Sequence, residues 1–406
     1  MLYEFWHNFT HNLFKPLLLF FYMGFLIPLL KIQFEFPYVL YQGLTLYLLL
    51  AIGWRGGEEL ATIDASSIAG VLGFIVLGFF TNLIIGFVAY ALLTRMTKMR
   101  RIDRATVAGY YGSDSAGTFA TCLGVLVTLD IAFDAYMPVM LAVMEIPGCI
   151  VALILVARLR ERGMDPLGNM ADEPGYNPRV RRELVGAAQL SGPHTATRRE
   201  RGIEEELKIS LEKLEHIGPG TDPVPGASVP ASGVLLREVL LNPGLYLLFG
   251  GILIGFTSRL QGASVIEDGD HVFVTAFQGM LCLFLLEMGM TASRKLKDLR
   301  TAGRGLIAFG LLAPNLFATA GIFVIHTYSQ LTGMHFETGS YVLFAVLCGA
   351  ASYIAVPAVQ RMAIPEASPT VPLASSLGLT FAYNVTIGIP LYLQIAKAVN
   401  AWLPVG

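Results

Sequence analysis

Charged residues are scarce in this chain. They make up 14% of its 406 residues, whereas a soluble domain carries about 25%. Hydrophobic residues make up 54% of the chain, and the mean hydropathy is +0.60. This composition excludes an ordinary soluble globular protein and predicts a polytopic membrane protein. The formal net charge of −2 says little about partners, because the charges are confined to the segments between the apolar runs.

Cysteines are few, and the common catalytic motifs are missing. The four cysteines lie in apolar runs without Cys-x-x-Cys spacing, so we interpret them as buried apolar side chains. The sequence has no P-loop, no dinucleotide-binding glycine motif, no His-Glu-x-x-His motif and no basic patch for nucleic acid. We therefore expect neither an enzyme nor a nucleic-acid-binding protein. Residues 1–14 contain no Lys or Arg, so we expect no cleaved signal peptide.

Ten apolar segments are long enough to cross a bilayer, which takes about 20 residues. They are 14–30, 38–54, 67–94, 105–128, 136–157, 241–258, 272–292, 305–328, 340–359 and 374–399. The stretch between the fifth and sixth spans is rich in Arg, Glu, Gly and Pro, which predicts a charged, flexible cytosolic insert. We expect an all-α polytopic membrane protein in three parts: spans one to five in 1–157, the insert in 158–235, and spans six to ten in 236–406.

Basic residues between the spans predict the orientation of the chain. They cluster after the third span, at the start of the insert and after the seventh span, as Arg95, Lys98, Arg100, Arg101, Arg104, Arg158, Arg160, Arg162, Arg294, Lys295, Lys297, Arg300 and Arg304. The loops on the opposite side carry several acids and little positive charge. One orientation suits every loop, with the basic clusters in the cytosol and both termini extracytoplasmic.

The two halves of the chain contain a weak internal repeat. Residues 49–60 (LLAIGWRGGEEL) align without gaps to residues 285–296 (LLEMGMTASRKL). The acids Glu58 and Glu59 match the bases Arg294 and Lys295, and each half has an odd number of spans. Both features predict that the halves are inverted repeats, which is an architecture of secondary transporters.

Two stretches of small and hydroxyl residues interrupt the fourth and ninth spans. They are 112–118 (GSDSAGT) and 349–355 (GAASYIA). Each should break its helix and leave backbone groups that hydrocarbon cannot satisfy. Paired interruptions of this kind indicate a transporter's binding site. The free N–H groups and positive dipole end of each half-helix favour a small anion, with the hydroxyls of Ser115, Thr118, Ser352 and Tyr353 nearby.

Three acids lie within the predicted spans. Asp114 is a functional-site hypothesis, because an intramembrane carboxylate is costly; it could ligate Na⁺, carry a proton or cap the half-helix that follows. For Glu145, in the fifth span, we favour cation or proton handling over a structural hydrogen bond. Glu287 lies near the cytosolic end of the seventh span, so we expect it to snorkel or to pair with Arg294. For Asn384, in the tenth span, we expect a structural role.

At these segments the chain resembles the SbtA-type sodium-dependent bicarbonate transporters, a family first recognised in cyanobacteria. The resemblance covers nearly all ten spans and is carried by residues 111–119 (YGSDSAGTF), 144–147 (MEIP), 349–357 (GAASYIAVP) and 364–369 (IPEASP). It implies two inverted repeats with broken fourth and ninth helices, core and gate domains that suggest an elevator-type mechanism, and a homotrimer in a bacterial inner membrane. It also implies that bicarbonate and Na⁺ lie between the broken helices, and that a PII-like regulatory protein binds the cytosolic face.

The chain departs from the cyanobacterial pattern in both broken segments. The family's Ser-Gly-Ser-Thr becomes residues 115–118 (SAGT), with one hydroxyl fewer. The acid of the second segment is replaced by Tyr353, and Asp114 adds an acid to the first. The acid of the family's Met-Asp-Ile-Pro-like motif is kept as Glu145.

We therefore predict a secondary transporter that imports a small anion, bicarbonate, together with Na⁺ and with no other cofactor. The predicted substrate-binding residues are Ser115, Ala116, Gly117, Thr118, Ser352 and Tyr353, and the predicted cation-binding residues are Asp114, Glu145 and Ser352. Two alternatives stay open. One is an H⁺- or Na⁺-coupled transporter of another small carboxylate or inorganic anion. The other is a membrane receptor that acts through a cytosolic partner without transport.

Overall fold

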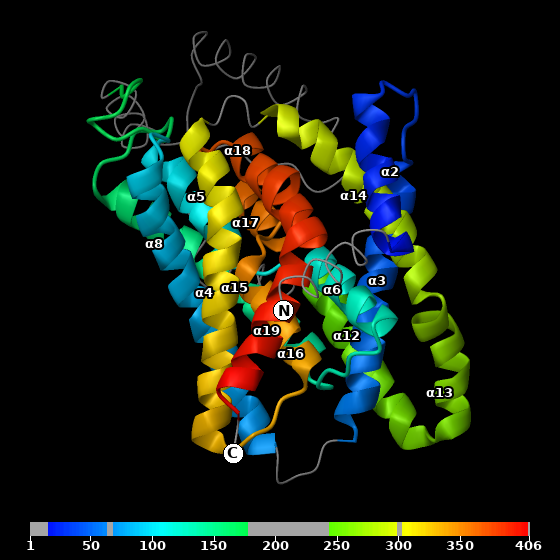
Figure 1. Ribbon diagram of the computed structural model, residues 1–406. Helices are drawn as coiled ribbons and strands as arrows, with labels where there is room; N and C mark the ends of the chain where they lie inside the picture. Colours follow the sequence, from blue (N-terminus) through cyan, green and yellow to red (C-terminus); the bar gives the residue numbers. More distant parts are fainter. Residues whose placement is uncertain (1–14, 63–67, 178–242, 299–302, 405–406) are drawn as a thin grey trace, which may run out of the picture.

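The computed structural model describes residues 15–62, 68–177, 243–298 and 303–404 (Figure 1). Within these ranges the chain is helical and contains no β-strand. Five helical stretches are long and apolar enough to cross a membrane, namely Ile68–Met96, Met137–Glu161, Ser264–Leu296, Arg304–Thr332 and Thr370–Trp402. Two shorter apolar helices are Pro16–Leu29 and Thr338–Gly349. The prediction of an all-helical chain with several membrane-spanning helices is confirmed, and the count of ten spans stays a prediction.

The helices of the first half follow the predicted apolar segments. They are α2 (Pro16–Leu29), α3 (Tyr38–Leu60), α4 (Ile68–Met96), α5 (Arg101–Tyr111), α6 (Ala116–Thr128), α7 (Met137–Met144) and α8 (Ile146–Glu161). The fourth predicted span is thus two helices, α5 and α6, as expected. The fifth is also divided, at Glu145, where the sequence Glu-Ile-Pro places a proline in the first turn of α8 and so removes a backbone donor from the helix ladder. Most of the predicted insert, from residue 178 to 235, lies outside the described residues.

The second half has a similar order of helices. It contains α12 (Pro243–Gln261), α13 (Ala263–Asp270), η2 (His271–Thr275), α14 (Phe277–Asp298), α15 (Arg304–Thr332), α16 (Thr338–Gly349), α17 (Ala355–Ala363), α18 (Thr370–Leu373), η4 (Ala374–Phe381), η5 (Asn384–Gly388) and α19 (Ile389–Trp402). The ninth predicted span is broken between α16 and α17, as expected. The tenth contains two π-helical stretches, η4 and η5. π-Helices are rare in proteins as a whole, and those that do occur are often found at functional sites.

Two helix pairs, α3 with α12 and α14 with α2, form one side of the molecule. We call these four helices the wall; α2, α3 and α14 lie at the right in Figure 1. Their backbones meet at glycines, which let helices approach closely in a membrane. A side chain at Gly53 of α3 would collide with the backbone at Leu248 of α12, and one at Gly289 of α14 would collide with the backbone at Phe21 of α2. Gly53 and Gly289 are the two glycines that the internal repeat aligns.

The same pairing appears from the partner helices of the wall. Gly251 of α12 packs against the carbonyl oxygen of Leu50, and Gly24 of α2 packs against that of Leu286. Leu50 and Leu286 are aligned by the internal repeat. The α3–α12 and α14–α2 contacts are therefore made by residues at matching positions of the two halves.

The remaining helices, α4 to α8 and α15 to α19, form the core. The longest are α4 and α15, each of 29 residues. α4 packs against α5 and α8, while α15 packs against α16 and α19. The broken helices α5–α6 and α16–α17 are thereby held inside the core, where nearly every residue of 101–126 and 339–352 is buried.

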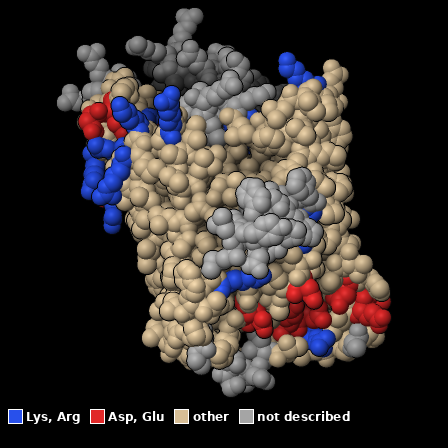
Figure 2. All heavy atoms as spheres, viewed as in Figure 1, with Lys and Arg blue, Asp and Glu red and all other residues tan. Residues whose placement is uncertain are grey.

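Charge separates along the long axis of the molecule. Figure 2 shows Lys and Arg gathered toward one end and most of the visible acids at the other, around α13. The basic end contains the start of α5 and the end of α8, where Arg160 forms an ion pair of 2.8 Å with Glu366. The acidic end contains Glu58 and Glu59 of α3 and the acids of α13. The polarity agrees with the predicted loop pattern, and the orientation of the termini in a membrane stays a prediction.

Candidate functional site

The first broken helix restarts on a serine cap. Ser115 precedes α6 in an extended conformation, and its Oγ accepts hydrogen bonds from the Thr118 N–H (3.2 Å) and the Thr118 hydroxyl (2.9 Å). Serine at this position satisfies a donor that a new helix leaves unpaired. Ser115 and not Asp114 is the residue that caps, so the capping alternative for Asp114 is wrong.

The second broken helix makes direct contact with the first. α16 ends at Gly349 and α17 begins at Ala355. In the segment between them, the Ser352 N–H donates to the Tyr110 carbonyl at the end of α5 (2.8 Å). Ser352 Oγ also accepts from the Val356 N–H (3.5 Å). The backbone N–H of Ser352 is therefore engaged by the other broken helix, which leaves its hydroxyl as its contribution to a ligand.

Two buried asparagines satisfy carbonyl groups that the breaks leave without a helical donor. Asn384 Nδ2 donates to the Gly349 carbonyl at the end of α16 (2.9 Å), which confirms its structural role. Asn82 Nδ2, from α4, donates to Met144 at the end of α7 (3.0 Å) and to Leu347 of α16 (3.4 Å). Asn82 was missed by the sequence reasoning, although an asparagine in the middle of an apolar run was a signal for it.

Asp114 and Glu145 come together at the centre of the core. Asp114 is fully buried, and neither of its carboxylate oxygens has a hydrogen-bond partner in the described part of the chain. Glu145 lies at the junction of α7 and α8, with 7% of its surface exposed, close enough for the two carboxyl groups to repel one another. Ser113 Oγ donates to the Glu145 carbonyl (2.8 Å) and joins the two segments.

This pair does not resemble a transition-metal site. Among the described residues, no cluster of three His, Cys, Asp or Glu side chains could hold a metal ion. Two carboxyl groups beside serine hydroxyls and backbone carbonyls are instead oxygen donors, which suit a hard cation or a proton. An unpartnered buried carboxylate costs several kcal/mol in its charged form, and either a bound cation or a proton would remove that cost.

The N-terminus of α6 faces an aromatic cluster. Gly117 has no room for a side chain, because the Tyr353 hydroxyl and the Phe284 ring occupy the adjacent space. Tyr353 packs edge-on against Phe381 with 5.7 Å between ring centroids. Its hydroxyl is buried without a hydrogen-bond partner of good geometry among the described residues. Phe284 stacks on Tyr41 of α3, 6.1 Å between centroids. Phe284 and Tyr41 had no sequence signal, since both read as ordinary lipid-facing aromatics.

The predicted site residues thus fall into two adjoining groups. One group surrounds the start of α6 and consists of Ser115, Ala116, Gly117, Thr118 and Tyr353; the other consists of Asp114 and Glu145. Ser352 lies on the second break, where its N–H bonds to the end of α5. All are buried. The breaks bring together residues more than 200 positions apart in the chain, and their roles in binding stay predictions.

Glu287 does not make the ion pair that was expected for it. Its Oε1 accepts a hydrogen bond from the Thr291 hydroxyl (2.8 Å), one turn along α14. Its Oε2 is buried with no partner, and no ion pair with Arg294 is formed within the described ranges. The expected pairing is therefore wrong. Thr291 lies four residues after Glu287, so the two side chains are neighbours on the same side of α14. The Arg294 side chain is exposed to solvent instead.

Comparison with known families gives one match. The sequence profile of the Na⁺-dependent bicarbonate transporter superfamily matches residues 16–397, which includes all helices from α2 to most of α19. No curated protein matches the chain. The matched family is one of transporters and not of enzymes, in agreement with the expectation from the missing catalytic motifs.

Proposed function

We propose that this chain, which belongs to the Na⁺-dependent bicarbonate transporter superfamily, imports bicarbonate by symport with Na⁺. The observation that carries the proposal is the meeting of the two broken helices beside a fully buried Asp114 whose oxygens have no partner among the described residues. A site with half-helix N–H groups for an anion and free carboxylate oxygens for a cation suits a substrate pair of opposite charge. Each ion offsets the desolvation of the other.

The anion is assigned to the start of α6. The first-turn N–H groups of a helix have no acceptor in their own helix and carry its positive dipole end. We assign to the anion the backbone of Ala116 and Gly117, with the hydroxyls of Ser115, Thr118, Ser352 and Tyr353. Bicarbonate has three oxygens and one proton, so it can accept several hydrogen bonds and donate one. The missing side chain of Gly117 lets the Tyr353 hydroxyl approach the helix terminus.

The cation is assigned to Asp114 and Glu145, with the hydroxyl of Ser352. Without a cation, a negative Asp114 would repel the anion and would also be repelled by Glu145. A bound Na⁺ offsets both repulsions, the one between Asp114 and the anion and the one between Asp114 and Glu145. Each ion therefore raises the affinity of the protein for the other, and this mutual effect is the coupling free energy. A proton at the same carboxyl pair is the second candidate, because an unpartnered carboxylate oxygen suits either ion.

The matched glycine contacts of the wall support an inverted repeat of five spans per half. Gly53 of α3, which packs against α12, and Gly289 of α14, which packs against α2, occupy aligned positions, and so do Leu50 and Leu286. We propose that the core moves against the wall in an elevator-type motion that carries the site across the membrane. A homotrimer in a bacterial inner membrane, extracytoplasmic termini and a PII-like cytosolic partner follow from the family resemblance and belong to the same proposal.

The test is uptake of labelled bicarbonate into proteoliposomes of the purified protein, with and without an inward Na⁺ gradient at fixed pH. We expect uptake that requires the gradient and disappears when an ionophore dissipates it. Uptake that follows a proton gradient and ignores Na⁺ would assign the proton to the carboxyl pair. Absence of bicarbonate uptake with either gradient, in protein that remains folded, would contradict the substrate assignment and favour another carboxylate or a receptor.

A further inference from the structure

One face of α14 carries a line of functional groups from the central site toward the basic end of the molecule. Phe284, Glu287, Thr291 and Arg294 are three, four and three residues apart, so they share a side of the helix. At one end of this line, Phe284 touches Gly117 of α6; beyond its other end, Lys295 packs against Gly378 of η4. The face therefore runs along the boundary between the wall and the core.

An aromatic pair closes the central site on this boundary. Phe284 is 1% exposed, and its ring stacks on Tyr41 with an interplanar angle of 13°. The pair consists of one residue from α14 and one from α3, so both rings belong to the wall. The start of α6 therefore faces the wall at this pair of rings.

Glu287 lies one turn beyond this pair, toward the basic end. Its Oε1 is held by Thr291, while its Oε2 is buried and unpartnered among the described residues. An ionisable group within a membrane span is a functional-site hypothesis. A carboxylate with one oxygen fixed and one free is suited to hold a cation transiently.

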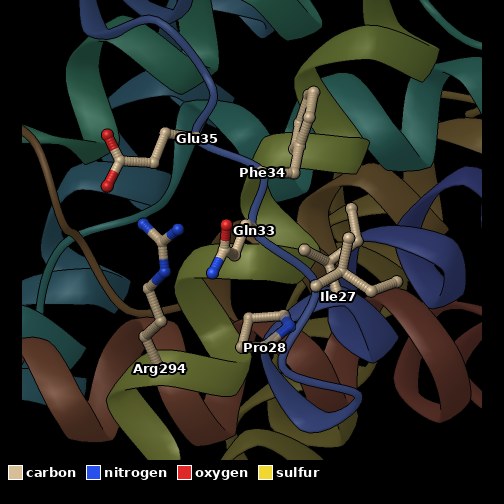
Figure 3. A pocket seen from close by; sticks show the side chains of 7 residues that line it. Ile27, Pro28, Gln33, Phe34, Glu35 and Arg294 are labelled. Carbon is tan, nitrogen blue, oxygen red and sulfur yellow. The ribbon is translucent and has the colours of Figure 1, made fainter.

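A cavity of about 690 Å³ opens where this line ends. It lies between the α2–α3 connection and α14 and is lined by Pro28, Gln33, Phe34, Glu35 and Arg294. Figure 3 shows the Glu35 carboxylate and the Arg294 guanidinium pointing into the same space. The two are not paired in the described part of the chain, where every ion pair involves other residues. The lining of the cavity thus includes one acidic side chain, Glu35, and one basic side chain, Arg294.

We propose that Glu287 is a second cation-binding residue, on a cytosolic exit route that runs along α14 from the Phe284–Tyr41 pair to this cavity. The direction of the route rests on the proposed function. Once the core has carried Asp114 and Glu145 past the aromatic pair, Glu287 on the wall receives the cation from them. The cation then passes Thr291 and enters the cavity, where Glu35 offers a negative charge and Arg294 attracts the anion.

The route is tested by cysteine accessibility, which does not require transport. In a background with the four native cysteines replaced, Glu287→Cys, Thr291→Cys and the control Ala292→Cys are exposed to a membrane-impermeant cationic thiosulfonate from each side of sealed vesicles. Ala292 is fully buried on the same helix. We expect positions 287 and 291 to react at least about tenfold faster than 292, from the basic side only. Equal rates at all three positions, or reaction from the acidic side, would overturn the route.

The cation-binding role is tested by Glu287→Gln, with Glu267→Gln at the acidic end as the matched control. We expect Na⁺-driven uptake to slow about tenfold in Glu287→Gln, with the half-saturating external Na⁺ concentration changed less than twofold. Unchanged uptake would overturn the role of Glu287. If the wild type does not transport bicarbonate, the proposed function fails while the accessibility pattern still decides the route.

Discussion

The two broken helices interrupt matching spans of the two halves and differ in chemistry. The first break contains an acid, Asp114, whose oxygens have no partner in the described chain, and a serine cap. The second contains no acid, and its Ser352 N–H is bound to the first break at Tyr110. In the proposed site the first segment therefore provides the acid and the helix start, and the second provides the hydroxyls of Ser352 and Tyr353.

This asymmetry is also where the chain departs from the cyanobacterial pattern that it resembles. Tyr353 stands where that pattern has an acid, and its uncharged hydroxyl lies next to Gly117. Asp114 places an acid on the other break, beside Glu145. We propose that Asp114 takes the place of the missing acid.

Asp114→Asn is the strongest test of this comparison. The amide has the same shape and removes a buried charge, so we expect the protein to fold, while Na⁺-coupled uptake falls by at least about 100-fold, or about 2.7 kcal/mol. Ser352→Ala, at the second break, should lose less, since it removes one uncharged hydroxyl from the proposed site and keeps the backbone N–H bond to Tyr110. Proteoliposome uptake measures both variants, and size-exclusion chromatography measures folding. Normal Na⁺-dependent uptake by Asp114→Asn would contradict the assignment of the cation to the first break.

The second test concerns the structural role of the second break. Asn384→Leu removes the donor to the Gly349 carbonyl and the acceptor of the Tyr392 hydroxyl. Because both groups are buried, we expect a loss of about 2 kcal/mol in stability, measured as a lower thermal unfolding midpoint in detergent. Asn315→Leu is the control, as Asn315 bonds only within its own helix and to the half-buried Tyr383. An equal effect of the two substitutions would show that Asn384 does not specifically support the break.

Much of this arrangement could be predicted from local sequence. The small and hydroxyl residues at 112–118 and 349–355 gave both breaks, because such residues interrupt a helix and expose its backbone groups. The serine before Ala-Gly-Thr gave a helix start. The aligned glycines at 53 and 289 gave a repeated element that the structure uses twice, for close contact of paired helices.

The contacts between distant segments could not be predicted. The Ser352–Tyr110 bond and the Arg160–Glu366 ion pair join residues more than 200 positions apart, and no periodicity encodes such distances. Phe284 and Tyr41 have the same residue types as lipid-facing aromatics, so only packing distinguishes them. For Glu287 the sequence left two expectations open, snorkelling and pairing with Arg294, whereas the structure has a hydrogen bond from Thr291, one turn along the same helix.

Tyr353→Phe tests whether the second break contributes a ligand group at all. The phenyl ring keeps the packing on Phe381 and loses only the hydroxyl that faces Gly117. We expect the half-saturating bicarbonate concentration to rise about tenfold, equivalent to about 1.4 kcal/mol for one lost hydrogen bond to a charged group. Tyr341→Phe, a buried tyrosine whose hydroxyl lies near His326, should leave that concentration unchanged. An unchanged value in Tyr353→Phe would mean that the second break only positions the first.

The smallest expected effect is the difference in stability between Ser115→Ala, at the first break, and Ser352→Ala, at the second. Ser115→Ala removes the cap of α6, for which substitutions cost about 1 kcal/mol, and it also removes a hydroxyl from the proposed anion site. Ser352→Ala removes a weaker acceptor, at 3.5 Å from the Val356 N–H, so it should change stability by less than about 0.5 kcal/mol. Thermal unfolding of both variants in detergent, with and without bicarbonate and Na⁺, compares them directly.

In wild type the two ions together should raise the unfolding midpoint, because they bind only the folded state, and Ser115→Ala should reduce that increase more than Ser352→Ala does. The reverse order would place the anion at α17 instead of α6, since the serine that the ligand contacts is the one whose loss weakens ligand stabilisation.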